Sequence, residues 1–192
     1  MTAKIFIDTQ FGGAKGRDPI SVGLVGEDAR LLYIEATDVT IGPFDVLSKF
    51  QRTVGAKFVP MASVRDEVAA WIKESARQDG VTLICSTVAV KKYWANELAE
   101  SQSSLRLSGL AVELTVGRPE DGIREKILGL CAGAGNCHAL MEALAIAVSH
   151  KGGGLTAAVD ATKFGLLIGA KNALSLRAYL RRMLEARPAA AA

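Results

Sequence analysis

A short apolar run, VTLIC at residues 81–85, lies between two segments with helical periodicity. Runs of this kind are typical of a strand in the middle of a sheet that is covered on both faces. The segments on either side repeat apolar residues every three or four positions, as a helix with one buried face does. These positions are Val64, Val68, Trp71 and Ile72 before the run, and Val90, Tyr93, Trp94 and Leu98 after it. A buried strand between two amphipathic helices predicts an α/β fold.

The first of these helices carries signals for both of its ends. Ser63, with Asp66 three residues later, resembles a capping box, in which each side chain bonds a backbone N–H of the first turn. Gly80 is a typical residue just past a helix end. We therefore expect this helix to begin at Ser63 and to stop at Gly80.

The first forty residues have the period of two that strands have. In residues 4–11, Ile5 and Ile7 alternate with residues that include Asp8 and Gln10, so a strand here places Asp8 and Gln10 on one face at its C-terminal end. Two more strands are expected in ISVGLVGE and ARLLYIEA, around a tight turn at Glu27 and Asp28. Together these segments predict a three-stranded antiparallel meander.

The rest of the chain reads as one further strand and three helices. The strand is GLAVELTV, at residues 109–116. Pro119 suits the first turn of the first helix, and the glycines after Lys151 end the second. The third is a C-terminal amphipathic helix, followed by a frayed alanine-rich end. We expect one domain at 1–150 and a separate extension at 151–192, joined by a glycine hinge.

Composition excludes several classes of protein. The 192 residues are 49% hydrophobic and 22% charged with a net charge of +3, which argues against a disordered chain and against a strongly basic nucleic-acid binder. No apolar run approaches the roughly 18 to 20 residues of a membrane span, and no leader is evident before Asp8. Three cysteines are too few for a disulfide framework. We therefore expect a soluble cytoplasmic protein without a membrane partner.

Four stretches, taken in order, resemble a known family. FIDTQF, SVGLVGEDARLLYIEA, RDEVAAWIKE and CHALMEALAIA are similar in sequence and spacing to the small DEDDh exonucleases, most closely the bacterial polyadenylate-specific 3′–5′ exoribonucleases related to RNase T. The likeness covers about residues 4–150. It implies an RNase H-like fold, in which a mixed central sheet begins with an antiparallel meander and is flanked by helices.

The family's reaction requires two divalent cations held by four carboxylates, together with a histidine that deprotonates water. The resemblance implies that the first two acids lie at Asp8 and Gln10, so the second is an amide. It places the third at Lys91 or Lys92, and residues 81–95 contain no acid at all. Two of the expected carboxylates are therefore missing.

The last motif of the family, a histidine followed five residues later by an aspartate, is also altered. Cys137 and Glu142 stand in these positions, although His138 beside Cys137 could serve after a one-residue shift. The four ligand positions sum to one negative charge, against the four positive charges of two magnesium ions. These positions are Asp8, Gln10, Lys91 and Glu142. We therefore expect a degenerate, inactive exonuclease-like protein that needs no cofactor and serves as a nucleic-acid-binding or assembly module.

The alternative is a residual nuclease. In this hypothesis Asp8 and Glu142 hold one Mg²⁺ or Mn²⁺ ion, and the ammonium of Lys91 or Lys92 replaces the second beside the scissile phosphate. It predicts metal-dependent trimming of RNA or DNA 3′ ends.

Other contacts with partners are expected outside this cluster. Lys15 and Arg17 follow two glycines in a loop that could approach a phosphate backbone, although the strand after the loop argues against a dinucleotide site. The exposed side of the C-terminal helix carries three arginines that are candidates for binding nucleic acid or an acidic partner: Arg177, Arg181 and Arg182. Because the family resembled here forms dimers, exchange of this helix between subunits of a homo-oligomer is a further possibility.

Overall fold

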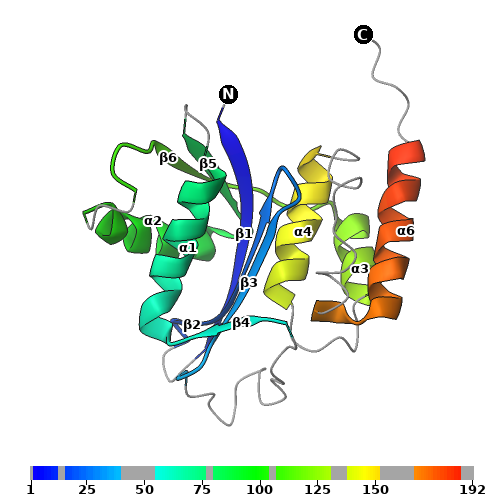
Figure 1. Ribbon diagram of the computed structural model, residues 1–192. Helices are drawn as coiled ribbons and strands as arrows, with labels where there is room; N and C mark the ends of the chain where they lie inside the picture. Colours follow the sequence, from blue (N-terminus) through cyan, green and yellow to red (C-terminus); the bar gives the residue numbers. More distant parts are fainter. Residues whose placement is uncertain are drawn as a thin grey trace.

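The computed structural model describes residues 2–12, 16–39, 55–76, 80–103, 107–130, 138–151 and 167–186. Six strands form one mixed sheet with the order β4-β3-β2-β1-β5-β6 (Figure 1). The strands are β1 (Ala3–Gly12), β2 (Asp18–Gly26), β3 (Leu31–Ala36), β4 (Lys57–Val59), β5 (Val81–Cys85) and β6 (Val112–Val116). The helices are α1 (Met61–Ser75), α2 (Val88–Ser103), α3 (Asp121–Leu130), α4 (His138–Lys151) and α6 (Ala170–Ala186).

The strand directions follow the sequence prediction. β1, β2 and β3 form an antiparallel meander, and β5 and β6 join it beside β1 as parallel strands. In this register Ile7 of β1 pairs with Cys85 of β5, so β5 ends beside Ile7 and the second half of β1 continues past it. The α/β class and the meander are confirmed.

Alternation along β1 divides the buried core into two layers. Ile5 and Ile7 pack with α1 and α2 on one face of the sheet, and Phe6 packs with α4 on the other. Asp8 and Gln10 share the parity of Phe6 and therefore belong to the α4 face. The expectation that these two polar residues lie on one face of the strand is confirmed.

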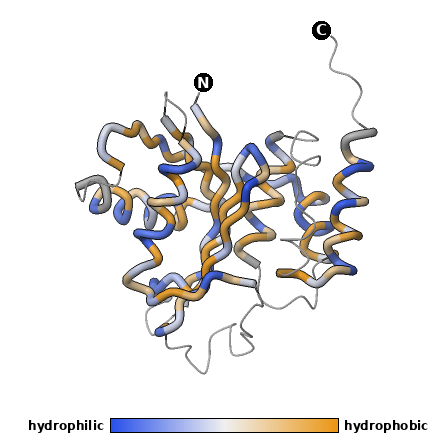
Figure 2. Tube along the Cα trace, viewed as in Figure 1, coloured by the Kyte–Doolittle hydropathy of each residue, from blue (hydrophilic) through white to orange (hydrophobic). Residues whose placement is uncertain are grey.

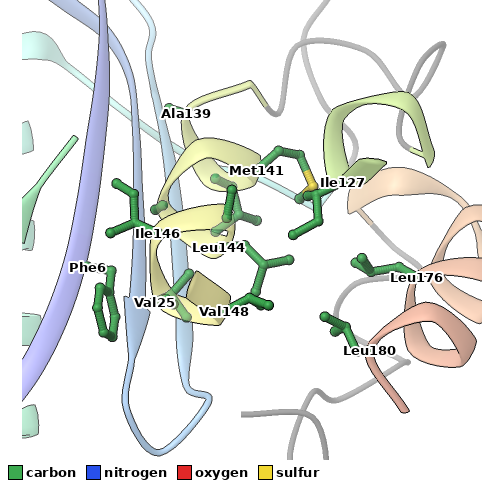
Figure 3. Close-up of a cluster of buried hydrophobic side chains, with 14 of the residues drawn as sticks. Phe6, Val25, Ile127, Ala139, Met141, Leu144, Ile146, Val148, Leu176 and Leu180 are labelled. Carbon is green, nitrogen blue, oxygen red and sulfur yellow. The ribbon is translucent and has the colours of Figure 1, made fainter. Parts of the chain in front are cut away.

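Helix α4 lies between the sheet and a further layer made by α3 and α6 (Figure 3). Residues 139–148 are all buried, because one side of the helix meets β1 and β2 while the other meets α3 and α6. A helix that is apolar all round is expected in such a position. In Figure 2 α6 instead alternates between polar and apolar residues. Two of its apolar residues, Leu176 and Leu180, are buried in the core.

A close contact between backbones fixes α4 on the sheet. Gly23 of β2 pairs with Asp8 of β1, and a Cβ atom at Gly23 would lie 2.3 Å from the Cα atom of Leu140. Only glycine leaves room for the helix at this point. The N-terminal half of α4 is thereby held beside the end of β1 that carries Asp8.

Three details of the sequence prediction are wrong. Helix α1 begins at Met61 rather than after Ser63, because the Met61 N–H donates to a carboxylate oxygen of Asp38 at 2.6 Å and no capping box forms. It ends at Ser75, and Gly80 instead begins the approach to β5, where its carbonyl accepts from the N–H of Ala3. Pro119 precedes α3 rather than lying in its first turn.

The extension after residue 150 shares the core of the preceding residues. α6 packs with α3 and α4 in one hydrophobic cluster. Within the described ranges, no helix is both long and apolar enough to cross a membrane.

Candidate functional site

A cavity of about 340 Å³ opens at the C-terminal ends of β1 and β5. Its lining comes from both strand ends and from the helices α3 and α4. The lining residues are Asp8, Thr9, Gln10, Ser86, Thr87, Pro119, Arg124 and Glu142. The three residues predicted from the first and last motifs, Asp8, Gln10 and Glu142, therefore meet in one place.

Asp8 is held by the residue that follows β5. Because Ile7 pairs with Cys85, the residue after Cys85, Ser86, lies beside Asp8. The N–H of Ser86 donates to the carbonyl of Ile7 at 3.1 Å. The hydroxyl of Ser86 donates to Oδ1 of Asp8. Asp8 is only 7% exposed, so this hydrogen bond compensates part of the cost of burying its carboxylate.

Gln10 is tied to the neighbouring strand rather than left free. Its side-chain carbonyl accepts a hydrogen bond of 2.9 Å from the hydroxyl of Ser21, which is its partner in β2. An amide can accept this bond without adding negative charge to the cavity. Gln10 therefore keeps an oxygen acceptor where the family resemblance expects a carboxylate.

Glu142 is a charged residue within the buried, otherwise apolar stretch of α4. It is 7% exposed, and its partner is Arg124 in the first turn of α3. Nε of Arg124 donates to Oε2 of Glu142 at 2.9 Å, and Nη2 donates to Oε1. The guanidinium thus hydrogen-bonds both carboxylate oxygens in the bidentate geometry that arginine favours.

The charges in the cavity act on one another. The hydrogen bond with Glu142 raises the pKa of Arg124, and the negative charge of Asp8 contributes in the same direction. Arg124 is 42% exposed along its side chain, so it faces the cavity as well as Glu142. It is therefore a permanent cation that contacts Glu142 and lies within electrostatic range of Asp8.

The N-terminal end of α2 also reaches the cavity. Thr87 precedes the helix, and its hydroxyl accepts a hydrogen bond of 3.2 Å from the N–H of Val90, as an N-cap does. The first turn of a helix carries a partial positive charge. This end of α2 therefore adds a partial positive charge to the cavity, besides the charge of Arg124.

Lys91 and Lys92, predicted to stand in for the third acid, lie one turn further along α2 and do not line the cavity. Lys91 lies close enough to the end of β5 for its positive charge to lower the pKa of Cys85. Burial is the larger effect and raises the pKa of this thiol to about 12. The position nearest Asp8 is instead occupied by Ser86.

Of the remaining predicted residues, those that the structure describes do not line the cavity. Cys137 and Lys15 lie outside the described residues, and His138 begins α4 with its side chain outside them. Arg17 is exposed before β2. The three arginines of α6 are also exposed and line no part of the cavity: Arg177, Arg181 and Arg182.

Sequence reasoning missed Arg124, Ser86 and Thr87. Arg124 resembles any cation on an amphipathic helix, and the signal that could have found it is Glu142. A carboxylate inside an apolar helix needs a cationic partner, and the helix before it offers Arg124.

The oxygen atoms that line the cavity do not suit the two divalent ions that the family resemblance implies. Hydrogen bonds engage Oδ1 of Asp8, the carbonyl of Gln10 and both oxygens of Glu142. The ionised groups among the described lining residues, Asp8, Glu142 and Arg124, sum to one negative charge, against the four positive charges of two divalent ions. In the parts of the chain that the structure describes, no three acidic, histidine or cysteine side chains form a metal-binding group.

Comparison with models of known families finds no match to this chain, and comparison with curated proteins finds none either.

Proposed function

We propose that this chain is a DEDDh exonuclease-like protein of RNase H-like fold that binds single-stranded nucleic acid at the cavity without cleaving it. The fold part of the proposal is supported by the antiparallel meander, by the parallel strands β5 and β6 beside β1, and by the helix that follows each of them. The sequence resemblance assigns its first acid to Asp8, which lies in β1 and lines the cavity.

The observation that carries the proposal is the meeting of Asp8, Gln10 and Glu142 in one cavity whose cation is Arg124. These are the positions in which the resemblance expects metal-binding carboxylates. Two carboxylates and one guanidinium leave a net charge of −1, which is too little to neutralise two divalent ions. Binding without turnover follows from a retained site that lacks the charge for metal chemistry.

The groups around the cavity suit a phosphate-containing ligand. Arg124 offers N–H donors at the cavity wall, and the N-terminal end of α2 at Thr87 adds the positive end of a helix dipole. A volume of about 340 Å³ is at the small end of ligand pockets, which span roughly 300 to 1,000 Å³. A single terminal nucleotide of an RNA or DNA strand is a ligand of suitable size.

A residual nuclease is the second candidate, because Asp8 and Glu142 do line the same cavity. In that case Mn²⁺ or Mg²⁺ would support shortening of a 3′ end, and Asp8→Ala would abolish it. If the substrate keeps the same length with the unaltered protein as with Asp8→Ala, both at high concentration, this candidate is ruled out.

A pair of variants with equal charge tests where the nucleic acid binds. Thr87→Asp adds a carboxylate at the cavity while aspartate preserves the N-cap of α2. Asn96→Asp adds the same charge to an exposed position further along the same helix. Fluorescence anisotropy with labelled single-stranded 20-mers of RNA and of DNA should show at least a tenfold loss of affinity for Thr87→Asp and less than a twofold change for Asn96→Asp.

The same titrations should weaken steeply with salt, because phosphate contacts release counterions. Equal affinity of the two variants would contradict binding at the cavity. Undetectable binding of both oligonucleotides by the unaltered protein at low salt would contradict the proposed function itself.

A further inference from the structure

The Arg124–Glu142 ion pair also bears on which cations the cavity can bind, and this deepens the part of the proposed function that concerns cleavage. We infer that Arg124 is the resident cation of the cavity and that it excludes divalent metal ions from the site between Asp8 and Glu142. The inference concerns metal binding rather than nucleic-acid binding, so it can fail while the proposed function stands, and the reverse.

The position of Glu142 explains why a cation is needed. The residue lies in a stretch of α4 in which every residue from 139 to 148 is buried between the sheet and the layer of α3 and α6. A buried carboxylate is costly unless a cation and hydrogen bonds compensate it. In a metal-dependent site the ion supplies that compensation, and here the guanidinium of Arg124 supplies it.

The geometry of the pair engages both carboxylate oxygens of Glu142. Nε and Nη2 of Arg124 each donate to a different oxygen of Glu142. A metal ion bound to Glu142 would share these oxygens with the guanidinium or displace it. It would also lie within a few ångströms of a positive charge that arginine does not lose at physiological pH.

Asp8 belongs to the same electrostatic cluster. Its charge raises the pKa of Arg124, which places the two groups within range of each other, and both line the cavity. With Arg124 present the three ionised groups sum to −1, and without it Asp8 and Glu142 sum to −2. Removal of this single side chain therefore leaves the charge that one divalent ion balances, with the Gln10 amide oxygen as a neutral ligand nearby.

A metal titration tests the inference directly. Mn²⁺ binding is followed by electron paramagnetic resonance with the unaltered protein, Arg124→Met and Arg177→Met. Arg177 is an exposed arginine on α6, so its replacement removes the same charge away from the cavity. We expect Arg124→Met to bind one Mn²⁺ ion at least tenfold more tightly than the unaltered protein, and Arg177→Met to behave as the unaltered protein does.

The gained site must also depend on Asp8. Adding Asp8→Asn to Arg124→Met should abolish the gain. Because loss of the ion pair could prevent Arg124→Met from folding, Arg124→Gln serves as a second variant that keeps a hydrogen-bond donor for Glu142 without its charge.

Two results would overturn the inference. One is a folded Arg124→Met or Arg124→Gln protein, judged by circular dichroism, that binds Mn²⁺ no more tightly than the unaltered chain. The other needs neither of these variants: tight Mn²⁺ binding by the unaltered protein that is lost in Asp8→Asn would show that Arg124 does not exclude the ion.

Discussion

Each oxygen-bearing side chain that the sequence pointed to in the cavity has a specific hydrogen-bond donor. Ser86 donates to Asp8, Ser21 donates to Gln10, and the third donor is the guanidinium of Arg124. Two of these donors are hydroxyl groups, which satisfy an acceptor without balancing its charge. Among the described lining residues, Arg124 is therefore the group that balances negative charge in the cavity.

Cys85 predicts a dependence of stability on pH at the scale of one residue. Its thiol is fully buried behind the cavity, and burial raises its pKa from 9.0 to about 12. The folded protein keeps this proton to higher pH than the unfolded chain, so unfolding releases a proton between pH 9 and 12 and stability falls as pH rises. From pH 8 to pH 10 the loss should be about 1 kcal/mol.

Urea unfolding of the unaltered protein and of Cys85→Ala at both pH values measures this contribution. The variant lacks the thiol, so its stability should fall less over the same interval, whatever its stability at pH 8. Parallel decreases in the two proteins would contradict the assignment of the effect to Cys85.

At the scale of elements, the contact between α4 and β2 holds Glu142 near Asp8. Gly23→Ala would place a methyl group against the backbone of Leu140, where no side-chain rotation can relieve the overlap. We expect it to lower the free energy of unfolding by about 3 kcal/mol, as other overpacked cores do.

Gly129→Ala is the matched control, because a Cβ atom at this position of α3 meets nothing within 4 Å. Alanine in a helix is favoured over glycine, so this variant should gain about 0.5 to 1 kcal/mol. Thermal and urea denaturation report both values. A Gly23→Ala protein as stable as the unaltered one would show that α4 is not held against β2 in this way.

A helix or strand could be predicted from the sequence when its hydrophobic pattern was long enough to recognise. β1, β2, β3 and β5 were predictable because each has enough apolar residues to show alternation or a buried run. β4 has three residues, of which Lys57 and Phe58 are exposed, so it has no pattern to detect. The start of α1 could not be read from Ser63, because its capping carboxylate comes from Asp38, which is distant in sequence.

The same limit applies to the site. The family resemblance led to Asp8, Gln10 and Glu142, which do meet in one cavity. Lys91 was expected there because the resemblance places the third acid after β5 at the start of α2, whereas the register of β5 against β1 brings Ser86 beside Asp8. The contact of Arg124 with Glu142 depends on how α3 packs against α4, and no local pattern in the sequence predicts that packing.

At the scale of the whole molecule, α6 is part of the packed body. Leu176 and Leu180 are fully buried in the cluster that contains α3 and α4, so this apolar face is covered by the chain itself. A dimer formed by exchange of α6 stays a prediction, and light scattering on the full chain tests it.

Two leucines of α6 test this packing as a pair. Leu176→Ala should cost about 2 to 5 kcal/mol, the usual cost of truncating a fully buried leucine. Leu174→Ala removes the same atoms from a side chain that is 63% exposed, and it should change stability by no more than about 0.5 kcal/mol. Equal stabilities of the two variants would mean that α6 does not pack on α3 in solution.

The central claim, binding without cleavage, is tested most directly on one sample. A single-stranded RNA or DNA 20-mer, labelled at its 5′ end, is mixed with excess protein and Mn²⁺; anisotropy reports the bound fraction, and a denaturing gel reports the length of the strand over time. We predict that the oligonucleotide is bound and keeps its full length, to the same extent as with Asp8→Ala. Progressive shortening from the 3′ end that Asp8→Ala abolishes would contradict this account.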